Sequence, residues 1–217
     1  MRYGILGTGV VGTTIATKLI HLGHEVMMGS RTSTNEKALA WAAANGEKAS
    51  SGTFADASAF GEIIFNCTKG SFSLEALRLA GKNNLDGKIL VDLSNPLDFS
   101  KGMPPTLIPE LSNTTSVGEE IQKLFPETKV VKTLNTVNCS LMVNPSLVSG
   151  EHEIFICGND AGAKSQVTGF LKNSFGWESV IDLGDISASR ATEMVLPLWV
   201  RLYGLYQSAN FNFHMAR

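Results

Sequence analysis

The clearest chemical signal in the sequence lies in six residues near its start, Gly7-Thr8-Gly9-Val10-Val11-Gly12. They follow a short apolar run and precede a run with helical periodicity, which is the setting of a turn that binds a dinucleotide pyrophosphate. In such a turn Gly7 permits the tight bend, Gly9 lets the backbone approach a phosphate, and Gly12 lets the helix pack closely on the strand. Free N–H groups at the start of the helix favour negative charge. The motif therefore predicts a dinucleotide cofactor.

The residues after the second apolar run indicate which dinucleotide this is. An NAD site usually has Asp or Glu about 20 residues after the glycine motif, where the carboxylate binds the ribose hydroxyls. This chain has Ser30 and Arg31 there instead. A guanidinium holds a 2′-phosphate that a carboxylate would repel. Lys37, on the next predicted helix, adds a second positive charge. The sequence therefore favours NADP(H) over NAD(H).

Three further polar segments follow predicted strands. Ligands of open α/β sheets bind outside the carboxyl ends of the strands, so we expect all three segments to border the cofactor. Turns use the same residue types without any ligand, and that explanation stays open. From the pyrophosphate region towards the nicotinamide and the acceptor, the candidates are Thr68, Lys69 and Gly70; Asn95 and Pro96; and Asn135, Thr136 and Val137.

The sequence offers no convincing acid–base pair. Tyr203 is followed four residues later by Gln207 rather than lysine, so there is no Tyr-x-x-x-Lys pair. Reduction of a carbonyl needs a proton donor beside its oxygen. Hydride exchange between a nicotinamide and a flavin-type ring mainly needs two rings to be stacked and aligned. We therefore predict no catalytic side chain and no metal site, and expect structural or surface roles for His21, His24, His152 and His214.

The elements that must position these residues alternate along the chain. Strands are predicted at 3–6, 25–28, 62–67, 88–93, 129–134, 153–157 and 177–182, and helices at 10–22, 35–44, 72–79, 116–124, 161–173 and beyond 186. This alternation predicts an α/β fold, namely a Rossmann-type, doubly wound and mostly parallel sheet with a small helical C-terminal part. We expect a single dinucleotide-binding domain over 1–217, with the Rossmann core at about 1–150 and further strands and helices at 151–217. The irregular segment 98–115 is predicted to be a surface or lid loop.

The composition excludes several classes of protein. The chain has 217 residues, a net charge of −2, 43% hydrophobic and 18% charged residues, and no basic run that would favour a nucleic-acid partner. We expect no secretory signal before the first strand, and the apolar stretch 194–206 is too short to span a membrane. Three widely spaced cysteines fit a reducing compartment. We therefore expect a cytoplasmic protein that acts on a small-molecule redox acceptor, with no membrane partner.

The predicted C-terminal helix carries an apolar stripe at helical spacing. Such a stripe favours core packing or a dimer contact over a cofactor contact. A homodimer through this helix is therefore one of the two arrangements that the sequence predicts. Arg190 and Glu193 lie three residues apart and are predicted to pair. Pro197 is expected to kink the helix. The stripe consists of Met194, Leu198, Trp199, Leu202 and Tyr206.

Several motifs together support a family resemblance. They are GTGVVG, the GSR after the second strand, LSNP, KTLNTVN at 132–138 and ASRATEMVLPLWVRLYGL near the end. Over nearly its whole length the chain resembles the deazaflavin (coenzyme F420)-dependent NADP reductase family. It is also similar to the cytosolic NADPH-binding domain of the STEAP metalloreductases. The resemblance implies a compact Rossmann domain and hydride transfer between NADP(H) and a flavin-like acceptor that lies against the nicotinamide.

One departure from the family concerns the acceptor. Better-known archaeal members have histidine and proline near the positions of Asn135 and Asn138, whereas both residues are asparagine here. The NADP half of the pattern is therefore intact and the acceptor half is altered. Deazaflavin, FMN, FAD and other electron acceptors stay open.

A second class of function also stays open, in which the protein is an NADPH-binding redox sensor or partner-binding module without turnover. The two hypotheses differ beside the nicotinamide. An enzyme is expected to keep an open apolar shelf near Val137 and Pro96. In a sensor, side chains such as Leu141 or Met142 are expected to fill that shelf.

Overall fold

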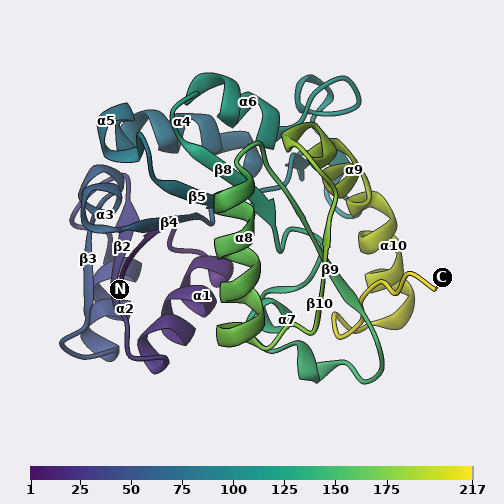
Figure 1. Ribbon diagram of the computed structural model, residues 1–217, viewed down its shortest axis with the longest axis horizontal. Coiled ribbons are helices and arrows are strands. Elements are labelled where there is room, and N and C mark those ends of the chain that lie inside the picture. The colour runs from purple at the N-terminus through teal and green to yellow at the C-terminus, as the bar shows by residue number, and fades with distance from the viewer. Residues whose placement is uncertain (217) are drawn as a thin grey trace.

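The computed structural model describes residues 1–216 and contains one large sheet (Figure 1). Its eight strands are Arg2–Leu6 (β1), Glu25–Ser30 (β2), Ala49–Thr53 (β3), Ile63–Asn66 (β4), Ile89–Asp92 (β5), Lys129–Thr133 (β8), Glu153–Cys157 (β9) and Ser179–Asp182 (β10). They lie in the order β10-β9-β8-β5-β4-β1-β2-β3. The chain therefore winds outward in both directions from β1 and β4.

Helices cover both faces of the sheet. The core on one face includes α1 (Val10–His21), α2 (Glu36–Ala44), α7 (Cys139–Val143) and α8 (Ala161–Phe170). The core on the other face includes α3 (Phe54–Phe60), α4 (Gly70–Ala80), α5 (Lys82–Leu85) and α6 (Val117–Leu124). In Figure 1, α1 and α8 cross the front of the sheet, whereas α4, α5 and α6 lie along its top. This arrangement confirms the predicted doubly wound α/β fold.

Strand direction determines where a ligand site can form. All neighbouring strands are parallel except β8 and β9, which pair in antiparallel register with Lys132 opposite Cys157. The carboxyl ends of β1, β4, β5 and β8 therefore meet at one edge of the sheet, which we call the carboxyl edge. Because β9 runs the other way, its first residue, Glu153, also lies at this edge. Ligands of such sheets bind outside the carboxyl ends.

Two elements, β3 and α3, were not expected from the sequence. The β3 segment is rich in serine and glycine and is only partly buried, so it lacks the apolar pattern of the central strands. Thr53 then begins α3 with a capping box, in which its side chain accepts from the Asp56 N–H and Asp56 accepts from the Thr53 N–H. The Thr-x-x-Asp spacing is a sequence signal for a helix start that could have located α3.

The C-terminal part contains a helix that is broken near the predicted kink. A 3-10 turn, Ile186–Ala188 (η4), leads into α9 (Ser189–Met194), and α10 (Leu196–Tyr206) follows after Val195. Pro197 lies in the first turn of α10, where a missing N–H is tolerated. Leu198 and Tyr206 of the predicted stripe are 51% and 58% exposed, so they do not belong to the core of the single chain, and the alternative of a dimer contact stays a prediction. Figure 1 shows α9 and α10 at the right, beside the C-terminus.

The remaining elements are short. The segment 98–115 lies on the surface as predicted and includes the second strand of a small hairpin. The hairpin consists of Leu97–Asp98 (β6) and Thr106–Leu107 (β7), and the 3-10 and π turns are Pro109–Leu111 (η1), Pro145–Leu147 (η2) and Leu171–Phe175 (η3). Within residues 1–216, no helix has both the length and the apolar character needed to cross a membrane.

Candidate functional site

Two adjoining cavities, each of about 300 Å³, form a continuous groove along the carboxyl edge. Their shared lining joins the glycine turn after β1 to the residues that follow β4. This is where the order of the strands reverses, the usual ligand site of open α/β sheets. We call it the cofactor groove, with an Arg31 end and a Phe99 end. The residues common to both cavities are Gly9, Cys67, Thr68 and Lys69.

The three motif glycines have different structural roles. Gly7 has a φ of +115°, a conformation that favours glycine. A Cβ on Gly12 would lie 2.2 Å from the Gly7 carbonyl oxygen, so α1 can pack on β1 only if Gly12 has no side chain. A Cβ on Gly9 would meet nothing within 4 Å. Gly9 therefore leaves free space in the groove at the start of α1, where a phosphate can approach the helix N-terminus.

Arg31 lies at one end of the groove, whereas Ser30 and Lys37, which were predicted to bind the cofactor with it, do not line the groove. Arg31 is exposed after β2, and its guanidinium carbon lies 5.8 Å from the centre of the Phe72 ring, which also lines the groove. Ser30 is buried, and its hydroxyl donates to the Thr32 carbonyl at 2.5 Å. Lys37 is exposed on α2 and does not line the groove. The free positive charges along the groove are therefore Arg31 and Lys69 among the described lining residues.

The turn after β4 is held by a buried polar network. Thr68 donates its hydroxyl to Asn66 at 2.6 Å, and Asn66 donates its amide to Asp92 at 2.8 Å. Burial and the nearby Asp92 charge raise the pKa of the Cys67 thiol well above its usual range, so this cysteine stays protonated. A Cβ on Gly70 would lie 2.2 Å from the Asn95 carbonyl oxygen. Gly70 thus allows α4 to pack against the next turn and does not line the groove.

The turns after β5 and β8 are joined by two asparagines. Asn95 donates its side-chain amide to the Asn135 carbonyl at 2.8 Å, and Asn135 donates its amide to the Asn95 side-chain oxygen at 2.9 Å. Asn135 also donates to the Thr192 carbonyl in α9 at 3.0 Å. Asn95 lines the groove. Asn135 lies behind it together with the other predicted residues of these turns, Pro96, Thr136 and Val137, all of which are buried.

The Phe99 end of the groove provides an open apolar surface. Its apolar walls come from Val10, Leu93, Leu97 and Phe99, and Val11 completes this side. Val10 and Phe99 are 70% and 50% exposed. Leu141 and Met142, which were expected to fill the shelf in a sensor, are buried in the core instead. The shelf is therefore open, although Val137 and Pro96 do not form its walls.

Three buried ionisable side chains lie behind this end of the groove. The Lys132 ammonium is 2.8 Å from Asp92 Oδ2 and 2.7 Å from Glu193 Oε1, and all three side chains are at most 1% exposed. Burial alone would lower the pKa of Lys132, but the two carboxylates raise it above its ordinary value. We call Asp92, Lys132 and Glu193 the buried ion triad. Its members come from β5, β8 and α9, so the triad joins the C-terminal helices to the sheet.

The predicted Arg190–Glu193 pair is wrong. Arg190 instead donates from Nε to Glu119 Oε2 at 2.7 Å, which links α9 to the first turn of α6. Glu193 points to Lys132 and accepts the N–H groups of Val117 and Gly118 at 2.8 and 3.1 Å. The spacing of three residues in one helix allowed the pair, but the tertiary neighbours of each side chain are stronger partners.

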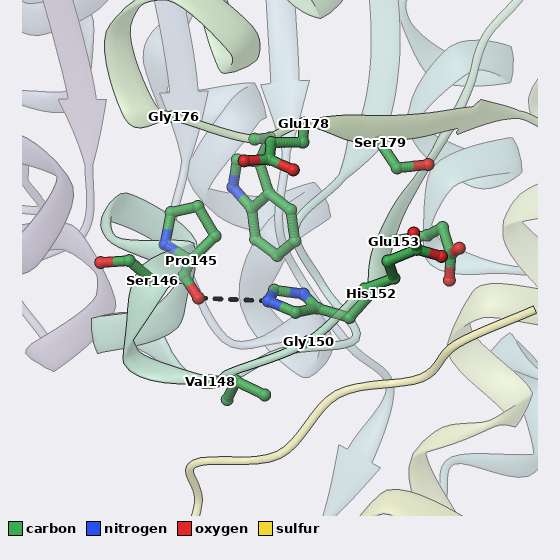
Figure 2. A pocket seen from close by; sticks show the side chains of 11 residues that line it. Pro145, Ser146, Val148, Gly150, His152, Glu153, Gly176, Glu178 and Ser179 are labelled. Atoms are coloured by element: carbon green, nitrogen blue, oxygen red, sulfur yellow. Dashed lines mark hydrogen bonds between the residues drawn. The ribbon is translucent and has the colours of Figure 1, made fainter.

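A second hollow of about 360 Å³ lies at the beginning of β9 and β10 and shares no residue with the groove (Figure 2). His152 projects into it, with Nε2 3.2 Å from the Pro145 carbonyl oxygen and Nδ1 3.0 Å from the Asn212 amide. His214 contacts the Glu153 carboxylate at 3.2 Å. These contacts fit structural roles for both histidines. Within residues 1–216, no group of three or more His, Cys, Asp or Glu residues is placed to hold a metal ion.

Comparison with known proteins identifies the family. The family model described as NADP oxidoreductase coenzyme F420-dependent matches residues 2–96. A crystal structure from Arthrobacter sp. FB24, provisionally named an F420-dependent NADP reductase, is 51% identical with a TM-score of 0.93, and the match covers 100% of both chains. The F420-dependent NADP reductase of Methanocaldococcus jannaschii is 31% identical over 155 residues, which are 70% of this chain and 67% of that protein. The chain belongs to the F420-dependent NADP oxidoreductase family.

This member of the F420-dependent NADP oxidoreductase family also has longer relatives. The metalloreductase STEAP3 of Rattus norvegicus is 29% identical over 204 residues, which make up 91% of this chain but 38% of STEAP3. Both resemblances that were drawn from the motifs are therefore confirmed. The family consists of NADP-dependent oxidoreductases. The chain has the same fold as the Arthrobacter protein over the full length of both chains.

Proposed function

We propose that the protein binds NADP(H) in the cofactor groove and transfers a hydride between NADPH and a deazaflavin or flavin-type acceptor. The observation that carries this proposal is the layout of the groove. A free guanidinium stands at one end, an open apolar shelf stands at the other, and a glycine without a neighbour lies between them. A dinucleotide with a 2′-phosphate has its parts in the same order: the 2′-phosphate at one end, the pyrophosphate in the middle and the nicotinamide at the other end.

Residues of this chain fit each part of the cofactor. Arg31 is free to bind the 2′-phosphate in a forked geometry, and the exposed ring of Phe72 lies beside it. The start of α1 and the space at Gly9 suit the pyrophosphate, with Lys69 as a nearby positive charge. The nicotinamide then reaches the Phe99 end, in front of Asn95.

The lining of the Phe99 end favours an acceptor that needs no acid–base group. Among the described residues this lining contains no histidine and no carboxylate, its cysteine is held as the neutral thiol, and its lysine, Lys69, is assigned to the pyrophosphate. Reduction of a carbonyl would call for a proton donor at this position. When bound, the cofactor supplies a hydride from C4 of its reduced nicotinamide, which a flavin or deazaflavin ring accepts as two electrons and one proton. The chain's own contribution is then to stack and align the two rings on the apolar shelf.

The direct test is anaerobic oxidation of NADPH, followed by absorbance, with deazaflavin F420, FMN and FAD offered separately. Rapid oxidation by any of the three supports the proposal and names the acceptor. Tight NADPH binding without turnover on all three would contradict it and favour the sensor hypothesis. The Gly9→Ala variant is a matched control. Its methyl group enters the groove without touching other protein atoms, so it should weaken NADPH binding, and with it NADPH oxidation, without disturbing the fold.

We also propose that two copies of the chain associate through α10. Leu198 and Leu205 are 51% and 71% exposed and lie seven residues apart, so they share one face of the helix. The C-terminal segment folds back onto another face, where Phe211 stacks on Trp199 with ring centres 5.2 Å apart. A two-fold contact would cover this exposed face of α10, with Leu198 and Leu205, on both copies. Light scattering should give a dimer mass that Leu198→Asp reduces to the monomer mass; a monomeric parent protein would contradict this proposal.

A further inference from the structure

The buried ion triad carries an unequal number of charges. One ammonium, on Lys132, faces two carboxyl groups, on Asp92 and Glu193. Arg190 and Glu119 form a separate ion pair between α9 and α6 and balance each other. If both triad carboxyls are ionised, the cluster has a formal charge of −1 in a site without access to solvent.

Hydrogen-bond donors surround both carboxyls of the triad. Burial raises the pKa of Glu193, whereas the Lys132 ammonium and the Val117 N–H act in the opposite direction. Asp92 accepts from the Asn66 amide at 2.8 Å and from the N–H and hydroxyl of Ser94 at 3.2 and 2.7 Å. Both Glu193 oxygens accept from N–H groups at the beginning of α6, and one also accepts from Lys132. Within the described chain, Glu193 has only donors as hydrogen-bond neighbours, so a proton on this carboxyl would have no acceptor. The positive end of α6 further favours the ionised form.

The triad lies directly behind the wall of the cofactor groove. Lys132 donates to the Ser94 carbonyl at 2.5 Å, while Asp92 accepts from the same residue. Ser94 and its neighbour Asn95 line the Phe99 end. One residue therefore separates the buried charge from the place where the nicotinamide is proposed to lie.

We propose that the net negative charge of the buried ion triad favours binding of NADP⁺ over NADPH and so makes bound NADPH a stronger hydride donor. This inference rests on the proposed binding of NADP(H) in the groove. The nicotinamide ring is positively charged when oxidised and neutral when reduced, and the two forms differ by one hydride. A fixed charge nearby therefore acts mainly on the oxidised form, and low solvent access strengthens its effect.

The test compares dissociation constants for NADP⁺ and NADPH in the full-length protein and its variants. NADPH is followed by its own fluorescence, and NADP⁺ by competition. Glu193→Gln and Asp92→Asn each remove one negative charge, and we expect the ratio Kd(NADP⁺)/Kd(NADPH) to rise about three- to tenfold. Thr192→Val is the matched control, since it changes a buried side chain of α9 without changing any charge. It is expected to leave the ratio unaltered.

The possible outcomes separate this inference from the proposed function. If the wild-type protein binds neither form, the proposed function fails. If both forms bind but the ratio is the same in folded charge variants and the wild type, the triad is only structural and the inference is overturned. Should both charge variants fail to fold, the wild-type protein alone decides the matter. The inference requires that it bind NADP⁺ more tightly than NADPH, and the reverse order would overturn it.

Discussion

Asn135 and Asn95 bind each other through both of their side-chain amides, across the carboxyl ends of β8 and β5. Asn135 also reaches the Thr192 carbonyl, so one buried carboxamide connects two turns of the sheet with α9. Asn95 borders the groove, whereas Asn135 lies behind it. Asn135 is therefore a structural link in this chain, and it acts on the groove through Asn95.

Replacing Asn135 with alanine should destabilise the protein. The change leaves the Asn95 side-chain oxygen and the Thr192 carbonyl without their donor, which costs about 1–3 kcal/mol of unfolding free energy. Thr136→Val is the matched control, because the Thr136 hydroxyl is buried and has no hydrogen-bond partner among residues 1–216. Its removal should be neutral or stabilising. Urea unfolding of the three proteins measures both effects, and equal losses in the two variants would contradict this role of Asn135.

The sequence could locate the cofactor groove because the residues that form its glycine turn lie close together along the chain. The glycine spacing and the apolar run before it fixed β1, the turn and the start of α1. The edge strand β3 was missed because its serines and glycine are half-buried and carry no apolar pattern. Ser30 and Arg31 are adjacent, but Ser30 is the buried last residue of β2, whereas Arg31 follows the strand and is exposed, so only Arg31 reaches the groove.

The ion pairs of the C-terminal part could not be found by the same reasoning. Arg190 bonds a residue 71 positions away, and Glu193 bonds backbone groups 75 and 76 positions away. Spacing along one helix contains no information on such partners. Burial of a lysine could not be expected from the sequence either, because an isolated lysine is rarely buried unless carboxylates surround it. Here the fold brings both carboxylates to Lys132 from other elements.

Arg31→Ala should weaken NADPH binding without affecting NADH. Loss of the charged partner of a phosphate costs about 1–3 kcal/mol, which corresponds to a roughly 5- to 150-fold increase in the dissociation constant. NADH has no 2′-phosphate, so its affinity should be nearly unchanged. Lys37→Ala is the control, since Lys37 lies outside the groove and should leave both affinities as they are. Fluorescence titration with both cofactors tests this, and equal losses for NADPH and NADH would refute the role of Arg31.

The motif glycines should respond differently to the same substitution. Gly12→Ala places a methyl group 2.2 Å from the Gly7 carbonyl oxygen, which is backbone and must shift, so a loss of about 1–3 kcal/mol in stability is expected. Gly9→Ala meets no protein atom and should leave the melting temperature nearly unchanged. It should instead weaken binding of NADPH, because its methyl group occupies the groove. Thermal melts with and without NADPH measure both, and a destabilised Gly9→Ala protein would contradict the assignment.

The Arg190–Glu119 contact should make part of the stability depend on pH. Burial raises the pKa of Glu119, but hydrogen bonds from Arg190 and Ser116 outweigh it and bring the value below the ordinary 4.5. A carboxyl with a lowered pKa in the folded state stabilises the protein above its unfolded-state pKa. This contribution, about 1 kcal/mol for a partly buried pair, should disappear as the pH falls through the folded-state value.

Urea unfolding of the wild type and of Glu119→Gln isolates this contribution when it is measured at neutral pH and again at a pH below the folded-state pKa of Glu119, which itself lies below 4.5. The variant should be less stable than the wild type at neutral pH, and the difference should shrink in acid because Glu119 is then protonated in both states of the wild type. The other carboxyls with lowered pKa values, such as Asp56 and Asp160, titrate alike in the two proteins and cancel in the comparison. A stability difference that stays constant with pH would show that Glu119 acts through packing and not through its charge.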